Sequence, residues 1–333
     1  MDAVIAEVMR GERVESAHLG AAIVVDADGA EVFTVGDVDA PVYPRSAVKA
    51  LQTLPMVESG VPDRLGLTEA EIALTCASHS GEPRHVETAR SILAKAGRDE
   101  TCLECGVQWP IDAATTRALA AAGETPSAIH NNCSGKHSGF ICLACDRGVD
   151  PAGYIKAQHP AMREVTAALS EMTGTRLDDS NRATDGCSIP TYAIPLEALA
   201  LAFARFGSGA GLAPARAAAA ARVRAAVTAD PFLVSGTGRF DNRLMTALGT
   251  RVFSKGGAEG VHCAAIPELG LGIAIKARDG AGRAAEVAMA ALVARLLPDA
   301  AGNAELTALR EPVLKNWNGI HVGAMRAAPM LRA

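Results

Sequence analysis

A serine and a lysine three residues apart, Ser46 and Lys49, form the sharpest chemical pattern in the chain. Residues at this spacing lie on one face of a helix, so the amine can approach the hydroxyl and accept its proton. With seven lysines in the chain, chance alone gives on the order of 0.3 such matches. An N-cap serine followed by an exposed lysine is the alternative, so the pair gains weight only from its context.

A second lysine follows a late apolar run, in the segment Ser254-Lys255-Gly256-Gly257. A strand that ends in a lysine and small residues resembles the Lys-Thr-Gly element of serine acyl-transfer enzymes, where small residues leave room for a substrate. A charged strand end with a glycine turn is the alternative. Two neighbouring lysines in a partly desolvated cleft would favour the neutral amine that a base requires, because both effects disfavour the ammonium.

The segment from Cys76 to Glu82 ends an apolar, helix-like run in a turn of small residues. Such turns expose hydroxyls and backbone N–H groups, so Ser78 is a candidate for a second serine or an oxyanion donor. A helix C-cap with polar turn residues is the bland interpretation of the same segment.

Cysteine and lysine also occur together in the polar segment 131–139, where Cys133 and Lys136 again lie three residues apart. The segment is not a phosphate-binding loop, because His130 stands where that motif needs its first glycine. Cys187, two residues after Asp185, offers another thiol. Two thiolates, a neutral amine and a water could complete a tetrahedral Zn²⁺ site, although lysine is a poor ligand choice.

These candidates need elements to position them, and apolar periodicity gives the outline. Residues 18–35 predict a β-hairpin, and residues 46–58 predict a helix that begins near Ser46. Helical patterns dominate residues 62–230. Strand patterns return between residues 251 and 278, and a final amphipathic helix is predicted over 283–297.

Strands at the two ends of the chain bury their apolar faces most economically in one shared sheet. We therefore expect an α/β (α+β) fold, with an antiparallel sheet from both chain ends and a helical lobe beside it. The sheet part should comprise residues 1–60 and 231–333, and the helical part residues 61–230. Together they are expected to form one catalytic unit, with the site in a cleft between sheet and lobe.

Composition narrows the class of protein further. The 37 acidic and 32 basic residues give a net charge of -5, which argues against a nucleic-acid partner bound by phosphate neutralisation. Apolar runs are too short for a membrane span and the N-terminus lacks the features of a signal peptide, so we expect a cytoplasmic protein. Eight cysteines are too sparse for a disulfide scaffold, and the pairs at 102/105 and 142/145 are interpreted as buried small hydrophobes.

Taken together, five motifs resemble the rhizobial-type, or class 3, L-asparaginases, in colinear order over nearly the whole chain. The motifs are Pro44–Lys49, Ala77–Glu82, His130–Gly139, Thr184–Cys187 and Lys255–Gly260. The wider group is similar to serine β-lactamases and serine-dependent glutaminases, which implies a β-lactamase/glutaminase-like fold.

The resemblance implies an amidohydrolase that converts L-asparagine to L-aspartate and ammonia through two Ser-Lys tandems. Ser46 with Lys49 forms one tandem, and Ser78 with Lys255 forms the other. Ser46 is the expected nucleophile, activated by neutral Lys49, while the other pair relays protons and keeps Lys49 neutral. Attack on the side-chain amide would give an acyl-enzyme that water releases.

The family resemblance also implies a zinc site and a homodimer. The metal ligands would be Cys133, Lys136 and Cys187, with the Zn²⁺ organising the substrate pocket. The implied substrate-binding residues are Arg45, His137 and Asp185.

Three rival hypotheses remain open at this stage. On the same fold, the chain could be a serine-dependent glutaminase or a β-lactam-binding enzyme. In another class, it could be a zinc- or thiol-based interaction module in which the Ser-Lys pair is accidental.

Overall fold

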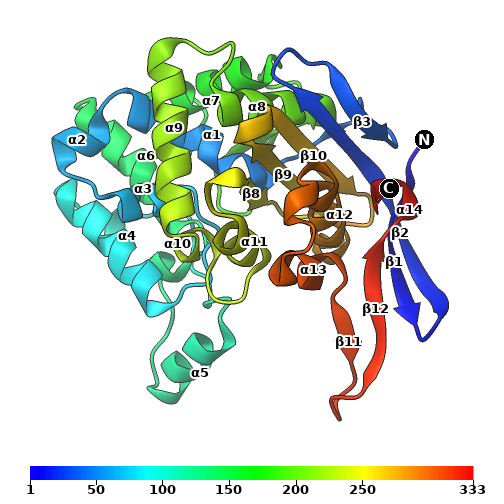
Figure 1. Ribbon diagram of the computed structural model, residues 1–333. Helices are drawn as coiled ribbons and strands as arrows, with labels where there is room; N and C mark the ends of the chain where they lie inside the picture. The colour runs from blue at the N-terminus through cyan, green and yellow to red at the C-terminus, as the bar shows by residue number, and fades with distance from the viewer. Residues whose placement is uncertain (333) are drawn as a thin grey trace. The chain divides into compact units, whose positions relative to one another are not determined.

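The computed structural model describes residues 1–332, which divide into two compact units (Figure 1). The sheet unit comprises residues 1–47, 194–211 and 243–332, and the helical unit comprises residues 48–193 and 212–242. No helix within residues 1–332 is long and apolar enough to cross a membrane.

One antiparallel sheet forms the centre of the sheet unit, in the order β11-β12-β1-β2-β10-β9-β8, with β3 also paired to β2. Its N-terminal strands are β1 (Ala3–Arg10), β2 (Arg13–Asp26) and β3 (Glu31–Val35). Its C-terminal strands are β8 (Phe253–Gly256), β9 (Val261–Ile266), β10 (Leu271–Ala277), β11 (Val313–Lys315) and β12 (His321–Ala327). The prediction of an antiparallel sheet from both chain ends is therefore confirmed.

Helices α8 (Leu196–Ser208) and α12 (Gly282–Leu296) cover this sheet. Helix α8 packs on β2, β9 and β10, whereas α12 packs on β1, β9, β10 and β12. A Cβ on Gly272 would lie 2.0 Å from the Ala200 carbonyl oxygen, so only glycine lets β10 approach α8 this closely. Since β9 is buried along its whole length, both faces of the sheet centre belong to the core. The short helices α13 (Ala304–Arg310) and α14 (Pro329–Arg332) pack against α12.

The helical unit is built around α1 (Lys49–Glu58) and α6 (Ser134–Asp146), which pack on each other. Around them lie α2 (Val61–Leu65), α3 (Glu69–Thr75), α4 (Pro83–Lys95), α5 (Ala113–Ala121), α7 (Pro160–Thr173), α9 (Pro214–Ala229) and α10 (Phe232–Ser235), with the hairpin β5 (Arg182–Thr184) and β6 (Pro190–Tyr192). Helix α11 comprises Phe240–Leu248, of which residues 240–242 are assigned to the helical unit and residues 243–248 to the sheet unit.

Local sequence explains where α3 starts and how closely α6 approaches it. Thr68 and Glu71 form a reciprocal capping box, which satisfies two otherwise unpaired N–H groups at the start of α3. A Cβ on Gly135 would lie 2.4 Å from the Leu74 carbonyl oxygen. The glycine therefore brings the first turn of α6 directly against the end of α3.

The division of the chain differs from the predicted one. Residues 194–211 were assigned to the helical part, but α8 belongs to the sheet unit because its apolar face, including Phe203 and Phe206, packs on the sheet and on Phe253. Conversely, residues 48–60 and 231–242 belong to the helical unit. Side-chain packing, rather than order along the chain, decides which unit a helix joins.

Candidate active site

Lys49, the first residue of α1, carries the most constrained amine in the helical unit. Its side chain is fully buried, and its Nζ lies 2.5 Å from the Ala77 carbonyl oxygen, 2.9 Å from Ser78 Oγ and 3.1 Å from Cys133 Sγ. Burial lowers the pKa of Lys49 because it disfavours the ammonium, and the nearby Lys136 lowers it further, while the cysteines at 133 and 187 oppose the shift.

The three partners of the amine are compatible with a neutral lysine. A carbonyl oxygen can only accept, so one N–H of Lys49 is committed to Ala77. A neutral amine has one further N–H, which Cys133 can accept, and one lone pair, which the Ser78 hydroxyl can use as its acceptor. Geometry therefore allows Lys49 to act as a base toward Ser78, a pairing that the sequence analysis did not make.

Ser78 lies in the turn after α3, two residues beyond the C-cap Cys76. Its backbone N–H donates to the Val234 carbonyl at 2.8 Å, and the N–H of the next residue, His79, donates to the Asn132 carbonyl at 3.1 Å. Although the main chain is held on both sides, the Ser78 side chain remains partly exposed. A hydroxyl that is accessible beside a buried amine suits proton transfer at a substrate.

Ser46 and Lys255 both belong to the sheet unit, where their segments touch. A Cβ on Gly257 would lie 2.5 Å from the Pro44 carbonyl oxygen and 3.1 Å from the Ala47 nitrogen. The end of β8, which carries Lys255, therefore packs directly against the turn that carries Ser46. Lys255 is 1% exposed, and its Nζ donates to the Gly256 carbonyl at 2.8 Å. Each predicted tandem, Ser46–Lys49 and Ser78–Lys255, has one residue in the sheet unit and one in the helical unit. Both tandems therefore stay predictions.

Arg45, a predicted substrate-binding residue, has a φ of 50°. This left-handed conformation is uncommon for a residue other than glycine and costs of order 1–3 kcal/mol. The strained residue immediately precedes Ser46 at the start of the short helix Arg45–Val48, which leads into α1. The chain thus adopts an unfavourable turn just where the predicted nucleophile is placed.

The predicted zinc ligands Cys133, Lys136 and Cys187 come together in the helical unit. Lys136 Nζ lies 3.0 Å from Cys187 Sγ, and the two thiols hydrogen-bond to each other. That hydrogen bond lowers the pKa of Cys133 well below its ordinary value, and nearby Lys49 and Lys136 lower it further. All three side chains are buried.

This donor set fits a zinc ion in its chemistry, because two sulfur atoms and an amine converge without an intervening carboxylate. Within residues 1–332, no three His, Cys, Asp or Glu side chains form a metal-binding group. A metal at this position would therefore need the Lys136 amine as a ligand. Burial disfavours the Lys136 ammonium, but the cysteines at 187 and 133 and Asp185 outweigh burial and raise its pKa, so a bound metal must displace a proton.

Asp185 and His137, the other predicted substrate-binding residues, lie around the same cluster. Asp185 opens a tight turn in which its backbone accepts from the Ser188 N–H at 2.9 Å, and the turn presents Cys187. His137 is fully buried with Nδ1 2.6 Å from Tyr154 Oη, which itself accepts from the Glu104 N–H.

In the tautomer with an unprotonated Nδ1, the Tyr154 hydroxyl donates to this atom and the imidazole hydrogen lies on Nε2. This N–H has no hydrogen-bond partner within residues 1–332. Burial lowers the pKa of His137 well below its ordinary value, so the ring is a neutral donor. A substrate oxygen would satisfy it, which is consistent with the predicted role.

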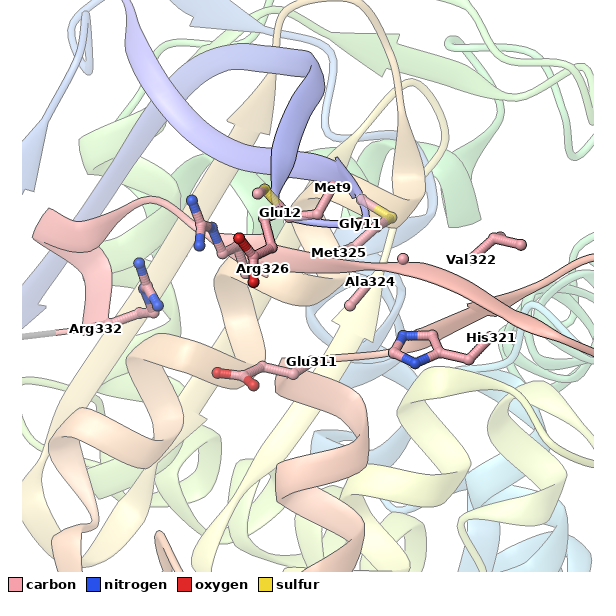
Figure 2. A pocket seen from close by; sticks show the side chains of 11 residues that line it. Met9, Gly11, Glu12, Glu311, His321, Val322, Ala324, Met325, Arg326 and Arg332 are labelled. Carbon is pink, nitrogen blue, oxygen red and sulfur yellow. The ribbon is translucent and has the colours of Figure 1, made fainter.

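None of these residues lines the cavity shown in Figure 2, which has a volume of about 580 Å³. Its walls come from β12 and the turn between β1 and β2, with His321, Arg326 and Glu12 among them. The eight cysteines are all free thiols. Of the two pairs predicted to be buried small hydrophobes, Cys105 and Cys142 are buried, whereas Cys102 and Cys145 are partly exposed.

Fold and site together give an α/β protein in which a buried amine is bonded to an accessible serine, the arrangement that acyl-transfer enzymes use to activate an alcohol. The model of the L-asparaginase II family matches residues 6–327, so the chain belongs to the L-asparaginase II family. No curated protein matches the chain.

Solved structures give more distant similarities. Mglu in its native form is 14% identical with a TM-score of 0.46, and the match covers 84% of this chain and 63% of that chain. Mglu in its L-glutamate binding form is 15% identical with a TM-score of 0.38, covering 84% and 59%. A β-lactamase from Mycobacterium bovis is 16% identical with a TM-score of 0.40, covering 80% and 90%. This chain thus spans less than two thirds of the length of Mglu.

Proposed function

We propose that the protein is an L-asparaginase that hydrolyses L-asparagine to L-aspartate and ammonia through an acyl-enzyme. The observation that carries the proposal is the hydrogen bond between the buried Lys49 amine and the Ser78 hydroxyl, in a chain of the L-asparaginase II family. A buried amine with a lowered pKa is the base that such a reaction needs near neutral pH.

In the proposed reaction, Ser46 Oγ attacks the side-chain amide carbon of asparagine while its proton passes to neutral Lys49 through the Ser78 hydroxyl, which is hydrogen-bonded to the amine. The tetrahedral intermediate collapses when the amide nitrogen accepts a proton and leaves as ammonia, which leaves an ester on Ser46. Ser78 and Lys255 relay the protons. A water molecule then attacks the ester, releases aspartate and returns the proton to Ser46. Backbone N–H groups near the start of the helical segment that carries Ser46 would stabilise the oxyanion.

Around the reacting groups, three further residues are proposed to hold the substrate. The Nε2–H of His137 and the guanidinium of Arg45 are suited to its carboxylate, and the carboxylate of Asp185 to its ammonium. Cys133, Lys136 and Cys187 would hold a Zn²⁺ ion, which would supply a fixed positive charge that organises the pocket. The nucleophile is an alcohol, so no reaction step needs this ion.

The decisive experiment measures ammonia release from asparagine and from glutamine by the wild type and by the variants Ser46→Ala and Ser78→Ala. We expect release from asparagine, and loss of turnover without loss of folding in Ser46→Ala. Unchanged turnover in Ser46→Ala would reject the mechanism, and faster release from glutamine would reject the substrate. Acid-quenched samples analysed by intact-protein mass spectrometry should show the acyl group on Ser46.

Homodimer formation, a cytoplasmic location and the absence of a nucleic-acid partner are proposed on the family resemblance and the composition. Light scattering at micromolar concentration checks the first of these. A monomeric mass would contradict it.

A further inference from the structure

His79, the residue after Ser78, is held in one orientation and one tautomer. Its side chain is fully buried. Its Nδ1 accepts the Gly81 N–H at 3.1 Å, and its Nε2 lies 2.9 Å from Ser134 Oγ. A backbone N–H can only donate, so Nδ1 carries no hydrogen; the hydrogen is on Nε2, which donates to Ser134.

Aromatic stacking restricts rotation of the His79 imidazole. His79 stacks on His85 with centroids 5.0 Å apart, and His85 stacks on Phe232 at 4.4 Å. Nε2 of His85 also lies 3.0 Å from the Phe232 carbonyl oxygen. The helix that contains Phe232 supplies the Val234 carbonyl to which Ser78 donates, so the same element supports both neighbouring residues.

The bond to Ser134 closes a ring of contacts around the Lys49 amine. Ser78 and His79 are adjacent in the chain, as are Cys133 and Ser134. Lys49 bonds to Ser78 at 2.9 Å and to Cys133 at 3.1 Å, and His79 joins Ser134 at 2.9 Å. The distance between the turn that carries Ser78 and the start of α6 is thereby held by side-chain contacts together with the bond from the His79 N–H to the Asn132 carbonyl. We expect a change in the His79–Ser134 contact to change how Ser78 meets the amine.

We propose that His79 is a positioning residue for the proposed asparaginase reaction. It keeps Ser78 within hydrogen-bonding distance of Lys49 through its bond to Ser134. It does not accept or donate a proton in turnover, because its only lone pair is engaged by Gly81 and its N–H by Ser134. This inference rests on the proposed function.

Two amide substitutions at His79 distinguish its contact with Ser134 from its contact with Gly81. In His79→Gln the amide nitrogen can reach Ser134, whereas in His79→Asn the shorter side chain can accept only from Gly81. We expect kcat for asparagine to stay within about threefold of wild type in His79→Gln and to fall about 10- to 100-fold in His79→Asn, with KM little changed. Ser134→Ala removes the same bond from the other side and should cost as much.

The double variant His79→Asn/Ser134→Ala completes the cycle. Because both changes break one bond, the double variant should lose no more activity than either single one. Additive losses would overturn the inference, as would a shifted pH-rate profile in His79→Gln, since a ring that does not titrate cannot move that profile. Thermal unfolding shows which variants fold, and Ser134→Ala keeps the test available if His79→Asn does not.

The proposed function can fail separately. If the wild type releases no ammonia from asparagine, the proposed function is rejected. The His79 imidazole is then examined by ¹⁵N NMR of histidine-labelled protein. A hydrogen that stays on Nε2 of His79 between about pH 5 and 8, and is lost in Ser134→Ala, supports the proposed contacts. An imidazole that titrates in this range would overturn the inference.

Discussion

Replacing Gly257 with alanine tests whether the end of β8 holds the predicted nucleophile in place. The new Cβ would lie 2.5 Å from the Pro44 carbonyl oxygen and 3.2 Å from the Ala47 Cβ. A carbon and a carbonyl oxygen approach to about 3.3 Å at closest, so the two backbone segments must separate by about 0.8 Å. Both partners are backbone or Cβ atoms, so no side chain can rotate away.

Such a separation moves the turn that carries Ser46. Overpacking of this kind costs about 1–3 kcal/mol of stability, and a displacement near 1 Å at a reacting group can cost about 10²-fold in rate. We therefore expect Gly257→Ala to lose about 10- to 100-fold in kcat/KM for asparagine, measured by coupled ammonia release. Urea unfolding should show the stability loss.

Gly282 at the start of α12 is the matched control in the same unit. A Cβ there meets no atom within 4 Å, so Gly282→Ala should keep full activity and gain roughly 0.5–1 kcal/mol. Wild-type activity and stability in Gly257→Ala would refute the argument that close packing at this glycine positions Ser46.

Three further predictions follow from the helical unit. Lys49→Met should lower kcat by about 10²- to 10⁴-fold, which is the rate enhancement that a general base typically provides. Ammonia release at near-wild-type rate would contradict the proposed base. Cys187→Ala should abolish zinc binding, measured by atomic absorption, while the buried control Cys142→Ala retains it; a full equivalent of zinc in Cys187→Ala would show that the ligands are misassigned. Burial lowers the pKa of His79 well below 6.5, so the folded state resists a proton that the unfolded chain takes up, and stability falls as pH drops below about 6.5. The loss is at most about 1.4 kcal/mol per pH unit. In denaturant titrations, the free energy of unfolding of His79→Gln should fall less steeply below about pH 6.5 than that of the wild type; equal slopes would contradict a neutral His79.

The local elements of the fold could be predicted because apolar periodicity is a local signal. The hairpin of β2 and β3, the helices α1 and α12, the mainly helical segment 62–230 and the strands between residues 251 and 278 are confirmed. Strand β1 and the β11–β12 hairpin were not predicted. Their pairing joins residues from opposite ends of the chain, such as Ala6 with Ala327, and β12 contains Gly323, which weakens any strand signal.

Residue identities at the site could be read from spacing, but their pairing could not. Lys49 bonds to Ser78, 29 positions away, because α1, the turn after α3 and the start of α6 pack together. His79 gave only the signal of a turn histidine. Its importance comes from the bond to Ser134, 55 positions on, which no local pattern encodes.

Lysine usage connects the composition of the chain to its site. Lysines are almost never buried in proteins, yet three of the seven here are no more than 2% exposed: Lys49, Lys136 and Lys255. Among the far more numerous arginines described, only Arg216 is buried. A guanidinium cannot lose its proton in a protein, whereas a buried amine can become neutral or pair with a thiolate. Burying three amines is unfavourable for stability, so we expect each to serve the site, Lys49 as an amine that can lose its proton and Lys136 as the partner of a thiolate. These are the three lysines that the motifs singled out.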